Sequence, residues 1–205
     1  MWKKVFCAVQ ACGDAAGIFY GAAALAALRL AQRIAKESGE DMGAGRLVSQ
    51  FSTEAGLGSA AIRYLSDSSV SHVDLVIEED RNLGGVTLKK GWLLGARLHG
   101  GVQQRPPEYA KFTRTVRMAV EVPDVDAAYA FAARQIGKPY NKRAIVNFFL
   151  HRKRAFTPEQ PAWFCDELNY QIVAAGGLLL LGTENPLNLT PQEELLSPYW
   201  KKVQA

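Results

Sequence analysis

The feature that most limits the fold is an alternating run between residues 112 and 122. Successive side chains of a β-strand point to opposite faces, so the alternation predicts a long strand with one buried face and one wetter face. A strand of this kind is typical of an antiparallel sheet that is covered on one side. The positions expected to face the core are Val116, Met118, Val120 and Val122.

Several shorter segments complete the predicted sheet. Arg46 to Ser52 alternates in the same way, and three further strands are expected at Val86 to Lys90, Trp92 to Leu98 and Val102 to Gln104. Ser71 to Glu78 is another strand, in which Val73, Leu75 and Ile77 share one face and His72, Asp74 and Val76 share the other.

Helices are predicted around these strands. Ser59 to Ser66 is expected to be a short helix whose buried side consists of Ala60, Ala61, Ile62 and Leu65. Asp124 is the predicted N-cap of a second helix, which Gly137 ends. A third helix is expected from Lys142 to about Leu150, before a basic loop at His151 to Arg154. In the tail we expect one strand and turns, within Leu178 to Leu181, Leu189 to Pro191 and Ser197 to Pro198.

Cys165 marks the strongest functional candidate. Leu168, Ile172 and Ala175 follow it at helical spacing, and a Gly-Gly pair after Ala175 is a typical helix end. Cys165 is therefore expected in the first turn, where unpaired N–H groups and the positive end of the helix dipole favour a thiolate. Asp166 acts in the opposite sense, so activation needs a histidine from elsewhere. The alternative is that Cys165 is a small buried hydrophobic residue.

His72 is the histidine that the pattern places best. It lies on a predicted strand, on the face opposite Val73, and a rigid strand is a suitable support for a general base. The alternative is a half-exposed strand histidine without a catalytic role. Together, His72 and Cys165 are the parts of a thiol hydrolase on an α+β domain.

Residues 1–42 are predicted to be an accessory helical segment, and residues 43–205 the main domain. The N-terminal segment is a poor signal peptide and a poor membrane span, because its apolar runs are short or interrupted by charge. The three cysteines form no disulfide framework, and Cys7 and Cys12 lack the partners of a zinc site. We therefore expect a reduced, cytoplasmic setting, with no cofactor and no metal.

The order of these segments resembles one family. Together they are similar to the permuted NlpC-type papain-like cysteine hydrolases of the YiiX/YaeF-like kind. The segments that carry the resemblance are Gly45 to Phe51, Ser71 to Val73, Gly101-Val102, Ile136 to Tyr140, Trp163 to Leu168, Gly176 and Leu189 to Pro191. The resemblance implies a circularly permuted papain-like α+β fold with a central antiparallel sheet packed against helices.

The resemblance also implies roles for particular residues. Cys165 would be the nucleophile, His72 the general base, and a polar residue on a neighbouring strand would orient the imidazole. The family commonly has an acid or another polar residue shortly before the Gly-Val pair, but no acid is present there. His99 is the nearest orienting side chain, with a plain loop histidine as its alternative. The family also usually has Ser where Asp166 stands.

The implied reaction is acyl transfer through an acyl-enzyme, on a peptide, an amide or a lipid ester. We expect an amidase or peptidase that acts on substrates such as cell-wall peptides. A lipid ester hydrolase or acyltransferase of the lecithin–retinol type is one alternative, and an inactive binding or structural module is another. The net charge of +4 permits an anionic cell-wall or membrane surface as a partner, whereas no motif indicates specific nucleic acid. The sequence does not indicate an oligomeric state.

Overall fold

The computed structural model describes residues 43–143, 146, 160–183 and 189–203. The predictions for residues 1–42 and for the basic loop lie outside these residues, as does most of the predicted helix after Lys142. The elements in chain order are β1 (Gly45–Glu54), α3 (Leu57–Leu65), β2 (His72–Val76), β3 (Arg81–Leu83), β4 (Val86–Leu88), β5 (Leu93–Arg97), β6 (Gly101–Arg105), β7 (Phe112–Val122), α4 (Val125–Gln135), α6 (Cys165–Ala175), α7 (Pro191–Leu195) and β8 (Lys201–Lys202).

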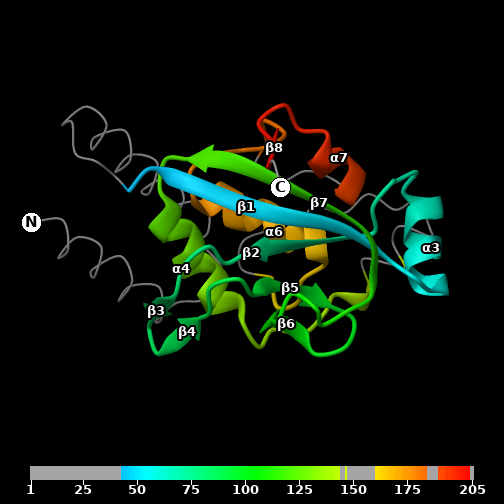
Figure 1. The fold of residues 1–205 in the computed structure, drawn as a ribbon, viewed down its shortest axis with the longest axis horizontal. Helices are drawn as coiled ribbons and strands as arrows, with labels where there is room; N and C mark the ends of the chain where they lie inside the picture. The colour runs from blue at the N-terminus through cyan, green and yellow to red at the C-terminus, as the bar shows by residue number, and fades with distance from the viewer. Residues whose placement is uncertain (1–42, 144–145, 147–159, 184–188, 204–205) are drawn as a thin grey trace, which may run out of the picture. The chain divides into compact units, whose positions relative to one another are not determined.

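Six of these strands form one sheet in the order β6-β5-β2-β1-β7-β8, and every neighbouring pair is antiparallel (Figure 1). Leu47 of β1 lies opposite Val120 of β7. Val120 and Val122 are buried in the main core as predicted, and Met118 packs against it, whereas Val116 is only half-buried and lies outside the core. On the other side of β1, Ser52 lies opposite His72 of β2. The strands β3 and β4 form a separate two-stranded ribbon.

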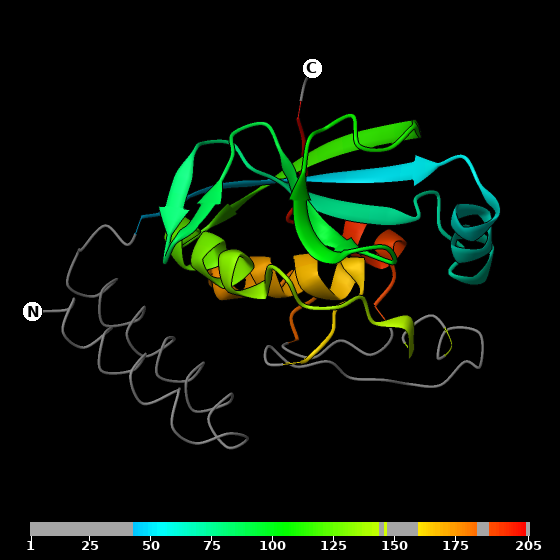
Figure 2. The same ribbon diagram turned by 90° about the horizontal axis from the view of Figure 1, so that it is seen from below.

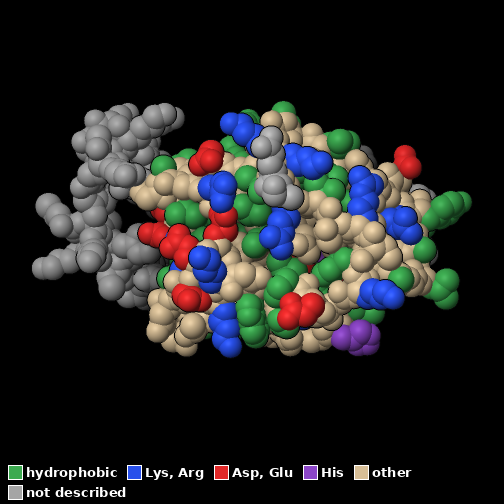
Figure 3. All heavy atoms as spheres, viewed as in Figure 1, with side chains coloured by type: hydrophobic (Ala, Val, Ile, Leu, Met, Phe, Trp, Pro, Cys, Tyr) green, Lys and Arg blue, Asp and Glu red, His purple; other side chains and the backbone are tan. Residues whose placement is uncertain are grey.

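Both longer helices, α4 and α6, lie against the same face of the sheet (Figure 2). The main core fills the space between them, with Phe51 and Leu75 from the sheet and Leu168 and Ile172 from α6. The predicted α+β arrangement of an antiparallel sheet packed against helices is therefore confirmed. The opposite face of the sheet carries Lys and Arg side chains that are spread out and interspersed with acidic ones (Figure 3). In the part of the chain described, no helix is long and apolar enough to span a membrane.

The burial of α6 differs from the prediction of one apolar side. Every residue from Cys165 to Ala174 is buried, including Asp166 and Glu167. The reason is that α6 contacts β2 and β5, α4, and α7 around its circumference. Polar groups on this helix are therefore held by partners inside the protein, as in the 2.9 Å hydrogen bond that Ser49 Oγ donates to Asn169 Oδ1.

Two further predictions need correction. The helix α3 forms, but it has no buried residue and exposes 90% of Leu57 and 88% of Tyr64, because it extends beyond the end of the sheet (Figure 1). In the tail, no strand forms at residues 178–181, whereas α7 and β8 were not predicted. The missed signal for α7 is a capping box, in which Thr190 Oγ1 accepts from Glu193 N and Glu193 Oε2 accepts from Thr190 N.

Candidate active site

His72 and Asp74 form a hydrogen-bonded pair on one face of β2. The distance between His72 Nε2 and Asp74 Oδ1 is 2.9 Å, and the two residues are 8% and 1% exposed. Side chains two positions apart on a strand share a face, which is the sequence signal for this contact. The resemblance implied an orienting residue on a neighbouring strand, whereas Asp74 lies on β2 itself.

The environment of Asp74 favours its charged form. Burial raises the pKa of this carboxyl, but the charge of His72, hydrogen bonds from His72 and Tyr109, and the charge of Arg97 together hold the pKa below its usual value. A carboxylate can only accept hydrogen bonds, so His72 Nε2 must carry the proton of the pair. In a neutral imidazole this leaves Nδ1 as the basic nitrogen.

Gly95 makes room for this carboxylate. Since Leu75 pairs with Leu94, Gly95 stands opposite Asp74 on the adjacent strand β5. A Cβ at position 95 would lie 1.9 Å from Asp74 Oδ1, which is far inside contact distance. Asp74 thus occupies the space of a side chain on β5, the neighbouring strand on which the resemblance placed the orienting residue.

Cys165 is the first residue of α6, as predicted, and it is 1% exposed. Burial and the charge of Asp166 raise the pKa of its thiol well above the usual value, against weaker opposing effects of backbone groups of Val73 and Asp166. This contradicts the predicted resting thiolate–imidazolium pair, because the helix N-terminus does not outweigh complete desolvation. Burial of Cys165 thus favours the neutral thiol over the thiolate.

The thiol lies beside the strand that carries His72. A backbone hydrogen bond between Val73, the next residue after His72, and the sulfur lowers the pKa of the thiol. Figure 2 shows that α6 and β2 begin at the same end of the fold, the end that carries α3. Within the described residues, however, no hydrogen bond joins Sγ of Cys165 to His72. The roles of Cys165 as nucleophile and His72 as base therefore stay predictions.

Three of the short segments that carry the resemblance meet next to Cys165. Val102 N donates to Lys138 O at 2.9 Å, and Gly137 N donates to Val102 O at 2.9 Å. Trp163 N then donates to Pro139 O at 3.0 Å. Residues 137–140 are thus tied to β6 on one side and to the residues before α6 on the other, and they bring Tyr140 close to the thiol.

A cleft of about 480 Å³ opens beside His72. Its walls come from the start of α3, the end of β5 and Tyr140, and they include Ser59, Ser71, Arg97 and His99. His99 is exposed in the turn between β5 and β6, and among the described residues it makes no hydrogen bond to His72. The acceptor found at the imidazole is Asp74, so an orienting role for His99 stays a prediction without a contact to support it.

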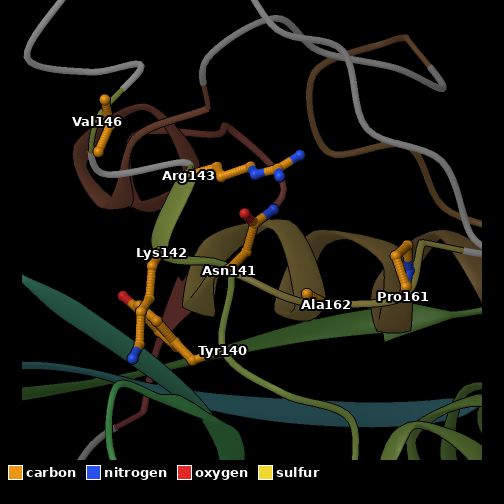
Figure 4. A pocket seen from close by; sticks show the side chains of 7 residues that line it. All are labelled: Tyr140, Asn141, Lys142, Arg143, Val146, Pro161 and Ala162. Atoms are coloured by element: carbon orange, nitrogen blue, oxygen red, sulfur yellow. The ribbon is translucent and has the colours of Figure 1, made fainter.

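Tyr140 also borders a second hollow of about 690 Å³. Figure 4 shows Tyr140 and Lys142 extending to one side of this segment, whereas Asn141 and Arg143 extend to the other. Tyr140 packs against Phe164 with ring centroids 5.6 Å apart. Burial raises the pKa of Tyr140, and the charges of Cys165, Asp166 and Glu167 raise it further. Tyr140 therefore stands between the two hollows and near the thiol.

Buried carboxyls surround the first turn of α6. Burial and the charges of Glu167 and Glu194 raise the pKa of Asp166 well above its usual value. Burial also raises the pKa of Glu194 to about 8, although Asn169 donates a 2.7 Å hydrogen bond to it. Nowhere in the described chain do three or more His, Cys, Asp or Glu residues form a group that could hold a metal ion.

Comparison with known proteins defines the fold class. No protein-family model matches the chain, and no curated protein matches it in sequence. Its fold is similar to a solved structure described as the metalloprotein yiiX from Escherichia coli O157:H7, DUF1105. The TM-score is 0.51 at 14% identity, over 80% of this chain and 97% of that one. At this identity the similarity shows the fold alone, and it agrees with the fold that the segment order predicted.

Proposed function

We propose that this protein is a cysteine hydrolase that forms an acyl-enzyme at Cys165, with His72 as general base and Asp74 as its orienting carboxylate. The observation that carries the proposal is the buried His72–Asp74 pair. The pair lies on β2, the strand beside the thiol, and His72 lines a cleft. A carboxylate that holds an imidazole in one tautomer is the usual support of a base in nucleophilic catalysis. The similar fold agrees with this class but does not establish it.

The steps begin from a neutral thiol. His72 Nδ1 takes the proton of Cys165 as Sγ attacks the carbonyl carbon of an amide or ester. The imidazolium returns that proton to the leaving amine or alcohol, which leaves an acyl thioester. Water then attacks the thioester while His72 again accepts a proton, and this releases the acid and the thiol. Sγ and Nδ1 must approach each other when substrate fills the cleft, as catalytic hydrogen bonds often do.

The burial of Cys165 favours a second candidate, a binding module that does not turn over its ligand. A thiol that is 1% exposed and has a raised pKa is poorly placed for attack without rearrangement. In this candidate Cys165 is a core residue, and the cleft beside His72 binds the same kind of amide or ester ligand.

Intact-protein mass spectrometry separates the two candidates. The protein would be incubated with a generic thioester, peptide amides, fatty esters and cell-wall fragments, with Cys165→Ala, His72→Ala and Asp74→Asn as variants. An acyl adduct that is absent from Cys165→Ala and slowed in the other two supports the hydrolase. An equal adduct in Cys165→Ala would place the acylation on a residue other than Cys165 and contradict the proposal. Calorimetric binding without any adduct supports the module.

A further inference from the structure

The geometry points to Tyr109 as a positioning residue that fixes the direction of the hydrogen bonds through Asp74 to His72. Tyr109 OH lies 2.7 Å from Asp74 Oδ2, whereas Asp74 Oδ1 faces His72 Nε2. The catalytic meaning of this contact rests on the proposed function. The contact itself, and its effect on the imidazole, can be measured without any substrate.

Packing holds the phenol in place from several sides. Tyr109 lies in the connection between β6 and β7, where its N–H donates to Pro106 O at 3.0 Å. The Cζ atom of Arg97 lies 4.6 Å from the ring centroid, and Phe112 meets the ring edge-on at 5.4 Å. Since the ring is fixed by these contacts, its hydroxyl is presented to Asp74 in one position.

The donors and acceptors allow only one direction. Arg97 Nη1 lies 2.5 Å from Tyr109 OH, and a guanidinium can only donate. The phenol oxygen accepts that bond, and its own proton is left for Asp74. Burial and the charge of Asp74 raise the pKa of Tyr109, so the phenol stays protonated and remains a donor. The chain of hydrogen bonds therefore runs from Arg97 through Tyr109 to Asp74, and Asp74 Oδ1 accepts a hydrogen bond from the Nε2–H of His72.

Removal of the hydroxyl would leave Oδ2 of a buried carboxylate without its donor. The carboxylate then loses its fixed orientation, and its bond to Nε2 competes with other arrangements. We expect the neutral His72 ring to populate both tautomers in Tyr109→Phe instead of only the one protonated at Nε2. Since Nδ1 is the proposed base, kcat/KM should fall about tenfold, mainly through kcat.

The test is nitrogen NMR of the His72 ring in the full chain, at a pH where the ring is neutral. We expect a protonated Nε2 and an unprotonated Nδ1 in the parent protein, and a mixture of both tautomers in Tyr109→Phe. Tyr64→Phe is the matched control, because Tyr64 is 88% exposed and should leave the spectrum unchanged. An identical His72 spectrum in Tyr109→Phe and Tyr64→Phe would overturn the inference.

A second variant serves if Tyr109→Phe does not fold. Replacement of Tyr109 by 3-fluorotyrosine keeps the ring and the hydroxyl but makes the phenol a stronger donor. The hydrogen bond from His72 Nε2–H to Asp74 should then weaken, and the proton resonance on Nε2 should move upfield. No movement would count against the inference. If the His72 spectrum responds while no acyl adduct forms at Cys165, the positioning role stands and the proposed hydrolase function fails.

Discussion

His72 and Asp74 stand two residues apart on one strand, and their side chains meet at 2.9 Å with almost no access to solvent. The base and its orienting group therefore come from a single rigid element. On the adjacent strand β5, Gly95 leaves room for the Asp74 carboxylate. This arrangement leads to the first two predictions.

Asp74→Asn should lower kcat/KM for any substrate that acylates Cys165, on the order of 100-fold. The amide cannot replace the carboxylate as an acceptor that also balances the imidazolium, and it can donate to the ring and favour the wrong tautomer. Steady-state kinetics would measure the effect, with Asp67→Asn in an exposed turn as the control. Equal activity of the two variants would show that Asp74 has no role in catalysis.

Gly95→Ala should destabilise the protein by about 1–3 kcal/mol, because the new Cβ collides with the Asp74 carboxylate. Gly58→Ala is the matched control, since a Cβ there meets nothing within 4 Å and the residue lies in α3. That change should stabilise the protein by roughly 0.5–1 kcal/mol. Urea unfolding would compare the two. A Gly95→Ala protein as stable as the parent would mean that Asp74 can move aside freely.

Glu194→Gln should remove part of the pH dependence of stability. Folding raises the pKa of Glu194 from its ordinary value of 4.5 to about 8. The protonated carboxyl therefore contributes fully to the free energy of unfolding below pH 4.5, and this stabilisation is lost as the pH rises to about 8. Compared with the parent, the variant should therefore gain stability between pH 5 and pH 8, by up to a few kcal/mol. Unfolding at several pH values would show this. Glu193→Gln, on the exposed side of α7, is the control.

Asp166→Asn should shift the alkylation of Cys165 to lower pH, because the charge of Asp166 raises the pKa of the thiol. Iodoacetamide rates would be measured from pH 6 to pH 10 in a Cys7→Ser/Cys12→Ser background. The parent should react slowly at neutral pH, as expected for a buried thiol. A profile unchanged by Asp166→Asn would show that burial alone sets this pKa.

Tyr140→Ala should speed the alkylation of Cys165 in the folded protein, because the Tyr140 ring lines the cleft and lies near the thiol. Tyr140→Phe keeps the ring and should leave the rate near that of the parent. Thermal unfolding would verify that both variants are folded under the assay conditions. Equal rates for the Ala and Phe variants would point to another route to the sulfur.

The sequence predicted the sheet well because alternation is a local property that packing preserves. Val116 to Val122 and the N-cap Asp124 illustrate this, since each depends on neighbours within a few residues. The burial of Asp166 could not be predicted in the same way. It results from α4, α7 and the sheet closing around α6, which are contacts between distant parts of the chain.

The candidate site was predicted in part for a similar reason. The motif order singled out Cys165 and His72, but whether they act together depends on a side-chain distance that no pattern contains. Asp74 was visible as a residue on the same face as His72. Its role depends on the space that Gly95 leaves. That Gly95 lies opposite Asp74 can be recognised only from the register of β2 and β5.

Because His72 and Asp74 come from one strand, the contact between them does not depend on how neighbouring strands pair. A pair assembled from two strands is broken when one strand slips by a residue, because every side chain then moves to the other face. Here a one-residue slip of β5 leaves the His72–Asp74 pair intact. It changes only which residue of β5 lies opposite Asp74 and must therefore be small. The segment His72 to Asp74 can thus be transferred as one piece to a strand of another sheet, provided that a glycine on the adjacent strand lies opposite the aspartate.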